Sequence, residues 1–334
     1  MKTALLFVLM MLVLIAPHEF GHFIVAKLCN VQVNEFSIGM GPLLFKKKKG
    51  DTQYSLRLIP IGGYCAMEGE EKASDNPRAY NQKNSGQRIA ILLAGVTMNV
   101  IIAMLACTIA TQISGVPTNT IDEIVKGSPA AISGMQAGDK IIQVDGNETA
   151  GWLDVTDAIS AYDGKGKLQI TVNRDGEEIN LNMVPKIDEE SQSYKVGIVS
   201  SLSRNPIMCV PYGIELTGTI AKEIFHAVGM MFDNGIHKDD VSGPVGLVKV
   251  VGEASSAGAS SYLILLALVS LNLALINLLP IPGLDGGKLL FIILKLITFG
   301  KINDEMEQKA SMVGLVLLLG LFVLVTVNDV INLF

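Results

Sequence analysis

Four long apolar segments constrain the fold of this chain more than any other feature of its sequence. They lie at residues 3–28, 89–113, 262–279 and 312–327. A helix needs roughly 20 apolar residues to cross a hydrocarbon core of about 30 Å, so we expect each segment to form a transmembrane helix. A fifth apolar run, at 289–299, contains Lys295 and is too short to span. It predicts a re-entrant or interfacial helix.

The composition agrees with an integral membrane protein and excludes two other classes. Hydrophobic residues make up 49% of the chain and charged residues 17%, so we expect the lipid bilayer to be its main surroundings. The net charge of -6 gives no concentrated basic face, which excludes nucleic acid as a partner. The four cysteines have no CxxC spacing, so neither a disulfide framework nor a thiolate zinc site is indicated.

The distribution of basic residues predicts the orientation. Residues 29–88, between the first two spans, hold the lysine run 46–49 and several other lysines and arginines. The positive-inside rule therefore places this loop in the cytoplasm. Four spans then put both termini and residues 114–260 on the outer face.

Two regions outside the spans have strand character. Residues 31–42 and 54–67 alternate and carry glycines, which predicts a membrane-associated β-hairpin on the cytoplasmic side. Residues 126–148 read as a turn, a short helix, a second turn and a strand, followed by a helical stretch and two strands joined at Asp175-Gly176. The phrase GSPA followed by GMxxGDxIxxVDG resembles a bacterial PDZ domain over about 116–185, which implies a peptide-binding module. A small β-domain without a ligand remains the alternative.

An amphipathic helix is predicted between this module and the third span. Its stripe repeats at steps of three and four, which is typical of a helix lying on a membrane surface. The stripe consists of Leu216, Ile220, Ile224, Ala227 and Met231. His226 and His237 lie in or after this helix, and we expect neither to bind metal.

The most specific motif lies inside the first apolar segment. His18, Glu19 and His22 form H-E-x-x-H, whose i, i+4 spacing brings both imidazoles to one helix face, where they can share a zinc ion. Glu19 is then placed to take a proton from a water molecule at the metal. Ionisable side chains inside a span are costly unless they line a polar cavity or bind something, so the setting strengthens the motif.

A zinc site needs a third protein ligand, and Asp285 is the best candidate. It lies in NLLPIPGLDGGK (277–288), where Pro280 and Pro282 break the helix at the end of the third span. At about 1.5 Å per residue His18 lies roughly 22 Å along the first span from Thr3, and Asp285 ends an inward-running span of similar reach. Both residues are therefore expected at the same depth. A plain turn with a solvated aspartate is the alternative.

Taken together, HEFGH, the FSIGMGP and IPIGGY strands, SGPVG and NxxPxPxLDGG resemble the bacterial site-2 proteases of the RseP/RasP type over essentially the whole chain. The resemblance implies an intramembrane zinc endopeptidase that cuts the transmembrane segments of single-span proteins, such as anti-sigma factors and remnant signal peptides. It implies His18, His22 and Asp285 as zinc ligands, Glu19 as the base and Asn277 as a substrate-positioning or oxyanion-binding amide. It also implies that the PDZ-like module filters or docks substrates.

Two features depart from the family pattern. Pro17 directly precedes His18, where the family more often has an aliphatic residue; it frees the carbonyl of Val13 and can kink the helix. The chain also has one PDZ-like module instead of two.

The expected fold is therefore a membrane α-helical protein with four transmembrane helices, a cytoplasmic-side β-hairpin and an extracytoplasmic α+β PDZ-like domain. The first two helices are expected at 1–28 and 89–113, with the loop 29–88 between them. The PDZ-like domain is expected at 114–187, followed by a linker with the amphipathic helix at 188–260. The third helix, the LDGG loop and a short helix are expected at 261–300, and the fourth helix and C-terminus at 301–334.

Two other functions fit part of the pattern. One is a membrane-bound PDZ adaptor with a structural or vestigial metal site, and the other is a metal transporter that uses His18, His22 and Asp285 in transit. Neither explains the placement of Glu19 beside the ligand pair. The sequence carries no indication of oligomeric state.

Overall fold

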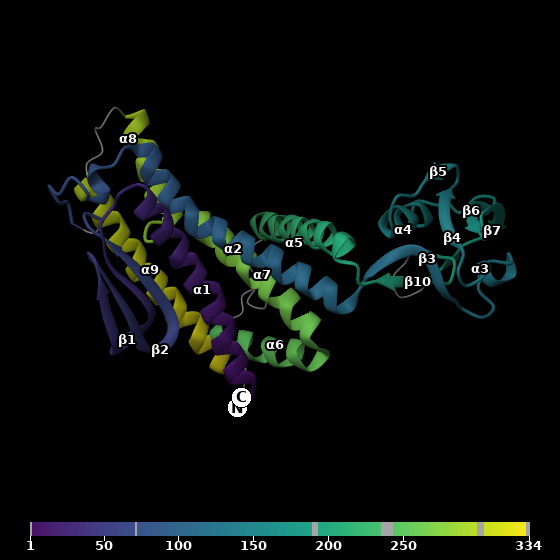
Figure 1. Ribbon diagram of the computed structural model, residues 1–334, viewed down its shortest axis with the longest axis horizontal. Helices are drawn as coiled ribbons and strands as arrows, with labels where there is room; N and C mark the ends of the chain where they lie inside the picture. The colour runs from purple at the N-terminus through teal and green to yellow at the C-terminus, as the bar shows by residue number, and fades with distance from the viewer. Residues whose placement is uncertain (1, 71, 189–192, 235–242, 299–303, 332–334) are drawn as a thin grey trace. The chain divides into compact units, whose positions relative to one another are not determined.

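The chain folds into two compact units. The computed structural model describes residues 2–70, 72–188, 193–234, 243–298 and 304–331 (Figure 1). The helical unit comprises Met1–Ala110 and Gly213–Phe334. The β-unit comprises Thr111–Tyr212.

Among the described residues, four helices are long and apolar enough to cross a membrane, which confirms the four apolar helices expected from the sequence. They are α1 (Lys2–Leu28), α2 (Ser85–Ser114), α7 (Ala259–Leu278) and α9 (Asp304–Ile331), whose apolar part is Met306–Val327. Helix α1 continues through Pro17, so the proline does not end it before the histidine pair.

Small residues let these helices approach closely. The core of the helical unit holds Met10 and Leu14 of α1 against Ala103 and Ala106 of α2, all at most 3% exposed. Leu266 and Ala267 of α7 complete this core. Because lipid chains are as apolar as leucine, close packing rather than hydrophobicity holds such helices together, and alanine at the contact permits it.

The region expected to be a linker contains two helices, α5 (Pro206–Asn234) and α6 (Pro244–Ala257). The predicted apolar stripe of α5 packs on the rest of the protein. Ile220 and Ile224 are buried in the core of the helical unit, and Leu216 packs on that core. Ala227 is exposed, and Val228 packs there instead. His226 is exposed, whereas His237 and the side chain of Met231 lie outside the described residues.

Helix α6 was not expected, and a carboxylate from α9 caps its first turn. The Asp329 side chain accepts hydrogen bonds from the backbone N–H groups of Gly243 at 3.0 Å, Val245 at 3.1 Å and Gly246 at 2.9 Å. The first N–H groups of a helix lack partners within it, and an acidic side chain there also opposes the helix dipole. The GPVG sequence at 243–246 therefore forms the start of α6.

The predicted hairpin is present, but it folds back on itself. Strands β1 (Val33–Lys49) and β2 (Thr52–Met67) are antiparallel. Residues 35–38 of β1 pair with both 53–56 and 63–66 of β2, whereas residues 43–49 pair with 52–57. The result is a sheet of four short strands with 43–49 at one edge and 63–67 at the other. Gly39, Gly41 and Gly62 have positive φ angles of 84°, 79° and 98° where the strands bend, a conformation that favours glycine.

The β-unit is a sheet with short helices. The strand order is β10-β3-β4-β6-β7, and β5 pairs with β4. The strands are β3 (Val116–Ile124), β4 (Lys140–Val144), β5 (Asn147–Glu148), β6 (Leu168–Arg174), β7 (Glu177–Met183), β8 (Lys186–Ile187), β9 (Tyr194–Lys195) and β10 (Ile198–Ser203), and the helices are α3 (Pro129–Ile132) and α4 (Trp152–Ser160). The strands predicted around the Asp175-Gly176 turn pair in register from Leu168↔Met183 to Arg174↔Glu177.

The β-unit extends further than the predicted domain 114–187. Strand β10 lies in the region expected to be a linker, yet it pairs with β3 along most of its length, from Ile198↔Ile124 to Ser203↔Val116. Short-range pattern does not reveal this pairing, because the two strands lie about seventy residues apart in the chain and their register is set by tertiary contact.

A buried ion pair ties the turn before β4 to β6. Asp139 has no exposed surface, and Arg174 donates to it twice, from Nε at 2.7 Å and Nη2 at 2.8 Å. The Gln136 N–H donates to the same carboxylate at 2.8 Å. Burial raises the pKa of the Asp139 carboxyl, but the hydrogen bonds and charge of Arg174 together with the Gln136 N–H outweigh it and hold the pKa below its usual range.

We expect Asp139→Asn to destabilise the β-unit by about 2 to 4 kcal/mol, because it removes the carboxylate that pairs with Arg174. Trp152, the one tryptophan of the chain, packs on the β-unit core, so its fluorescence reports unfolding of this unit in the full-length protein. Because the pKa of Asp139 is lower in the folded chain than in the unfolded one, its carboxylate stabilises the fold at pH values above the unfolded pKa of about 3.9. This contribution is lost as the pH falls through the folded pKa. Asp122→Asn, at an exposed carboxylate on β3, is the control and should leave the transition unchanged. An unchanged transition in Asp139→Asn would contradict the assignment.

Candidate metal centre

Two elements far apart in the sequence bring three metal-ligating side chains together. His18 and His22 lie one turn apart on α1, and Asp285 is the first residue of α8 (Asp285–Ile297). His18 and His22 are 7% and 6% exposed, so the cluster is shielded from solvent. Within the described part of the chain, this is the one group of at least three His, Cys, Asp or Glu residues that can hold a metal ion.

The three ligand atoms form a nearly equilateral triangle. The Nε2 atoms of His18 and His22 are 3.2 Å apart, and Oδ2 of Asp285 lies 3.3 Å from the first and 3.2 Å from the second. Ligands at zinc distances of about 2.0–2.1 Å in tetrahedral geometry are about 3.3 Å apart. The triangle therefore fits one zinc ion with a fourth position open.

The chemistry of Asp285 also fits a cation. Its Oδ2 is buried and has no hydrogen-bond partner among the described residues. A buried anionic oxygen that faces two imidazole nitrogens at van der Waals distance is the donor set of a catalytic zinc site with two histidines and a carboxylate.

Helix α2 supplies partners for the far side of each imidazole. His22 Nδ1 lies 2.8 Å from the Ile91 carbonyl oxygen, so it carries the proton and leaves Nε2 free to bind metal. His18 Nδ1 lies 3.3 Å from the Asn99 amide. Oxygen and nitrogen of an amide are interchangeable by a flip, and with Oδ1 turned toward His18, Asn99 accepts the same kind of bond.

Asn99 and two glycines were not predicted as site residues. Asn99 is a fully buried amide within an apolar span, which by itself marks a functional candidate. Gly95 and Gly21 carry no such signal. A Cβ on Gly95 would overlap the His22 ring, and one on Gly21 would overlap the Ala94 carbonyl. The two glycines therefore let α1 and α2 meet directly at the ligand pair.

Glu19 and Asn277 lie beside the ligands. Glu19 faces β2: a Cβ built on Gly63 would lie 3.4 Å from Glu19 Cγ. Its electrostatic neighbours include His22, His18 and Asp285. Asn277, in the last turn of α7, has its Nδ2 3.5 Å from His18 Nε2. Asn277 thus approaches His18 directly, and Glu19 is the next residue after His18 on α1.

Asp285 differs from its expected setting in an irregular loop. Helix α8 begins at Asp285, four residues before the predicted run at 289–299, and its first turn contains the two glycines that follow. Side chains at Gly286 and Gly287 would overlap the carbonyls of Leu279 and Ile281, so only glycine lets the chain turn back this tightly. The irregular backbone is confined to the residues just before it, where Gly283 has a φ of 98°.

A charged pair fixes the start of α8 against the segment after β2. Lys288 Nζ donates to Glu70 Oε1 at 2.6 Å. Burial by itself lowers the pKa of Lys288, but the charge and hydrogen bond of Glu70 outweigh it and raise the pKa. The pair therefore stays charged and joins the turn carrying Asp285 to the folded sheet.

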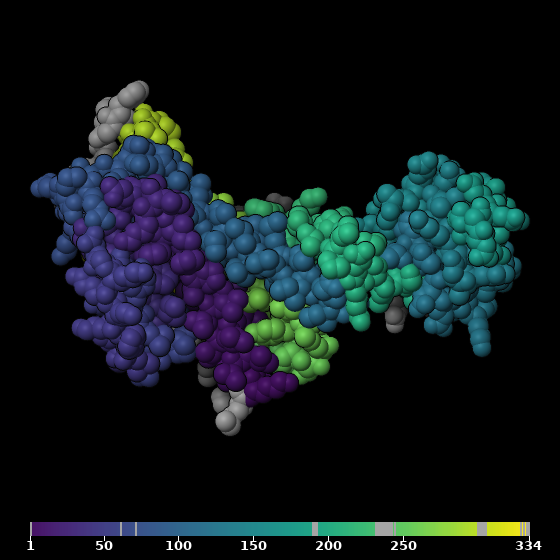
Figure 2. Space-filling view, in the orientation of Figure 1, coloured from purple at the N-terminus to yellow at the C-terminus, as the bar shows by residue number. Residues whose placement is uncertain are grey.

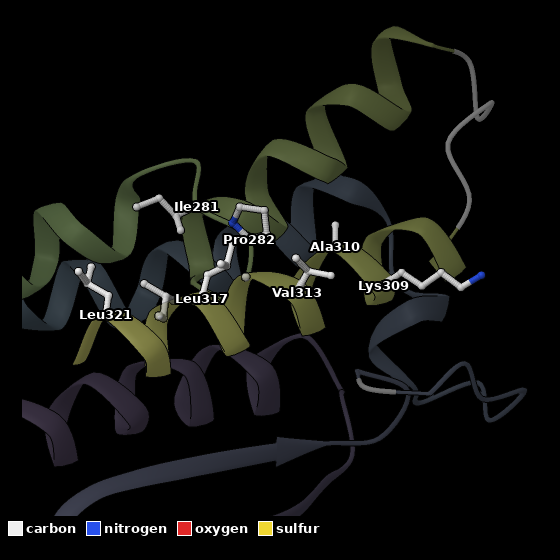
Figure 3. Close-up of a pocket in the computed structure, with 9 residues that line it drawn as sticks. Ile281, Pro282, Lys309, Ala310, Val313, Leu317 and Leu321 are labelled. Carbon is white, nitrogen blue, oxygen red and sulfur yellow. The ribbon is translucent and has the colours of Figure 1, made fainter. Parts of the chain in front are cut away.

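Helix α9 supports the same turn from another side. A Cβ at Gly314 would overlap the carbonyl of Pro282, so the turn and α9 touch backbone to backbone. Figure 3 shows Ile281 and Pro282 next to Ala310, Val313 and Leu317 of α9. An apolar cavity of about 570 Å³ runs along this contact.

The chain is similar to known proteins along nearly its whole length. The model of the family described as Peptidase family M50 matches residues 6–321. The chain belongs to peptidase family M50. A Clostridium acetobutylicum protein whose name assigns it to the zinc metalloproteases is 37% identical over 321 residues, which are 96% of the M50 peptidase and 94% of that protein. Zinc metalloprotease RasP of Bacillus licheniformis is 27% identical over 420 residues, with both chains covered completely.

These relatives make the M50 peptidase a zinc metalloprotease of the site-2 protease family. Among solved structures, the PDZ domain of an SdrC-like protein from Listeria innocua matches 27% of the chain and 96% of that domain, with 20% identity and a TM-score of 0.23.

We expect Asp285→Ala to lower zinc affinity by more than about 100-fold, since loss of an outer-shell partner alone costs 10- to 100-fold. Zinc content of the purified protein, measured against a graded series of chelators, checks this. Asp329→Ala is the control, because that carboxylate caps α6 instead. Full zinc retention in Asp285→Ala would remove Asp285 from the ligand set.

We expect Gly314→Ala to weaken zinc binding by about tenfold, because the added methyl group displaces the backbone of Pro282 and with it Asp285. Gly320→Ala is a matched control six residues further along α9, where a Cβ meets nothing within 4 Å. Equal zinc affinity in the two variants would show that α9 does not position the ligand.

Proposed function

We propose that this M50 peptidase hydrolyses peptide bonds within transmembrane segments of single-span membrane proteins, including anti-sigma factors and remnant signal peptides. One observation carries the proposal most directly: Glu19, which follows His18 in the H-E-x-x-H motif, lies against Gly63 in the 63–67 edge of the folded sheet. This contact supports a hydrolytic centre next to a backbone surface that can hold an extended peptide.

A transmembrane helix is protected from hydrolysis by its own hydrogen bonds. Every amide within it is tied in i to i-4 pairs, so the scissile bond must first be drawn out of the helix. Residues 63–67 pair with β1 on one side, and no other described strand pairs with them. A substrate segment added there as a further strand would exchange its helical hydrogen bonds for sheet hydrogen bonds.

The residues around the triangle have separate tasks in this proposal. Glu19 takes the proton of the attacking water and later gives it to the leaving amine. Asn277 donates from Nδ2 to the carbonyl oxygen as negative charge develops there. His18, His22 and Asp285 hold zinc, which when bound supplies the Lewis acidity that polarises the carbonyl and the water. The Ile91 carbonyl and Asn99 keep the two imidazoles in the orientation that binding requires.

The remaining elements set access and orientation. The lysine-rich segment 29–88 favours a cytoplasmic location for the sheet and the site. The β-unit would then lie on the outer face as a PDZ-like module, where its free edge strands β7 and β10 suit the capture of an extended chain end. Such a module would admit or dock substrates whose outer part has already been removed.

We expect Glu19→Gln to keep zinc bound and to slow cleavage of a single-span substrate by about 10²- to 10⁴-fold, because only the proton transfer is lost. The measurement is appearance of the cleaved fragment with purified protein reconstituted in lipid, with and without a zinc chelator.

Glu253→Gln, at an exposed site on α6, is the matched control and should cut at the normal rate. A protein that acts only as an adaptor would be unaffected by Glu19→Gln. Cleavage that survives both Glu19→Gln and the chelator would refute the proposed function.

A further inference from the structure

The outer edge strand of the folded sheet is uncovered over its whole length. All residues from Met40 to Lys49 are exposed, although they form regular β-structure. Leu44 and Phe45 are 59% and 61% exposed, and Leu56 and Leu58 on the neighbouring strand are also exposed. Figure 2 shows this sheet at the surface of the helical unit, with no other described element over it in that view.

The strand has two chemically distinct halves. Residues 43–45 are Leu, Leu and Phe, and residues 46–49 are four lysines in succession. The register decides where the lysines lie: Lys48 pairs with Gln53 and Lys49 with Thr52. They therefore gather at one end of the sheet and the apolar residues toward the other.

The lysine end lies level with the end of α1. Lys27, next to the last residue of α1, donates from Nζ to Thr52 Oγ1 at 2.7 Å, and Thr52 donates to the Val33 carbonyl at 2.7 Å. Since α1 is a candidate span that ends at Leu28, this level is where the helix leaves the hydrocarbon. The four lysines are thus at headgroup height, and the apolar half points back along the span.

The charge at this end is unbalanced within the chain. The turn between the strands contains one carboxylate, Asp51, and Arg78 pairs with it at 2.6 Å. Among the described residues, none of the four lysines forms an ion pair. An anionic partner outside the chain would complement them.

An exposed apolar edge strand is poorly suited both to water and to pure hydrocarbon. Its leucines and phenylalanine favour removal from water, whereas its unpaired N–H and C=O groups need polar partners. The boundary between acyl chains and headgroups meets both requirements, and long lysine side chains can extend from it to phosphates.

We propose that the strand 43–49 is a lipid-binding edge that docks on anionic phospholipid headgroups through Lys46–Lys49, with Leu43, Leu44 and Phe45 inserted beside the acyl chains. The contact holds the sheet at a set height against the leaflet where α1 ends. The opposite edge of the same sheet, 63–67, lies beside Glu19.

Amide hydrogen exchange of the full-length protein in nanodiscs tests the proposal. Discs of phosphatidylcholine alone are compared with discs that also contain phosphatidylglycerol. We expect exchange in residues 43–49 to be about tenfold slower in the anionic discs, and the difference to shrink with added salt. Replacing Lys46–Lys49 by glutamine should abolish the difference, and replacing them by arginine should preserve it.

Exchange at residues 35–38, in the middle of the sheet, shows whether each variant has kept its fold. Equal exchange of 43–49 in the two kinds of disc would overturn the proposal. Protection of 43–49 in phosphatidylcholine discs on addition of inorganic phosphate alone would also overturn it, because the edge would then bind free anions. Protection seen only when two chains share a disc would overturn it as well, because the edge would then bind a second copy.

Discussion

The meeting of two imidazoles and one carboxylate inside an apolar bundle is the constraint on which the helical unit depends. His18, His22 and Asp285 place three ligand atoms within 4.8 Å of one another at a site shielded from solvent. Such groups are costly to bury unless a cation or a full set of hydrogen bonds compensates them. A zinc ion held by these three side chains would supply that compensation and would link metal binding to correct packing of the helices.

Close backbone approach makes this meeting possible. Gly21 and Gly95 let α1 and α2 touch where the histidines lie, and Gly314 of α9 receives the backbone of Pro282 just before Asp285. Lys288 then ties the same turn to Glu70 beside the sheet. Helices α1, α2 and α9 and the sheet thus each limit where one ligand can be. A catalytic metal site needs this support, because a ligand displaced by a fraction of an ångström no longer fits the ion.

The two edges of the folded sheet lie in different surroundings. One edge lies by Glu19 and suits a substrate strand, whereas the other carries the lysine run and suits a lipid surface. A simple two-stranded hairpin would offer both edges along its full length. Folding back over Gly39, Gly41 and Gly62 separates them by two inner strands.

The sequence by itself determined the local features of this protein: four apolar helices, the one-turn spacing of His18 and His22, and the strands around the Asp175-Gly176 turn. Each depends on contacts within a few residues, which periodicity and turn chemistry encode. It also singled out Asp285, by its helix-breaking context and its expected depth in the membrane.

Only the tertiary structure decided which distant groups meet. The pairing of β10 with β3, the fold-back of β1 and β2, the start of α8 at Asp285, and the contacts of Asn99 and Gly314 join residues many positions apart. Their partners are chosen by packing of the whole unit, and local pattern carries no record of that choice.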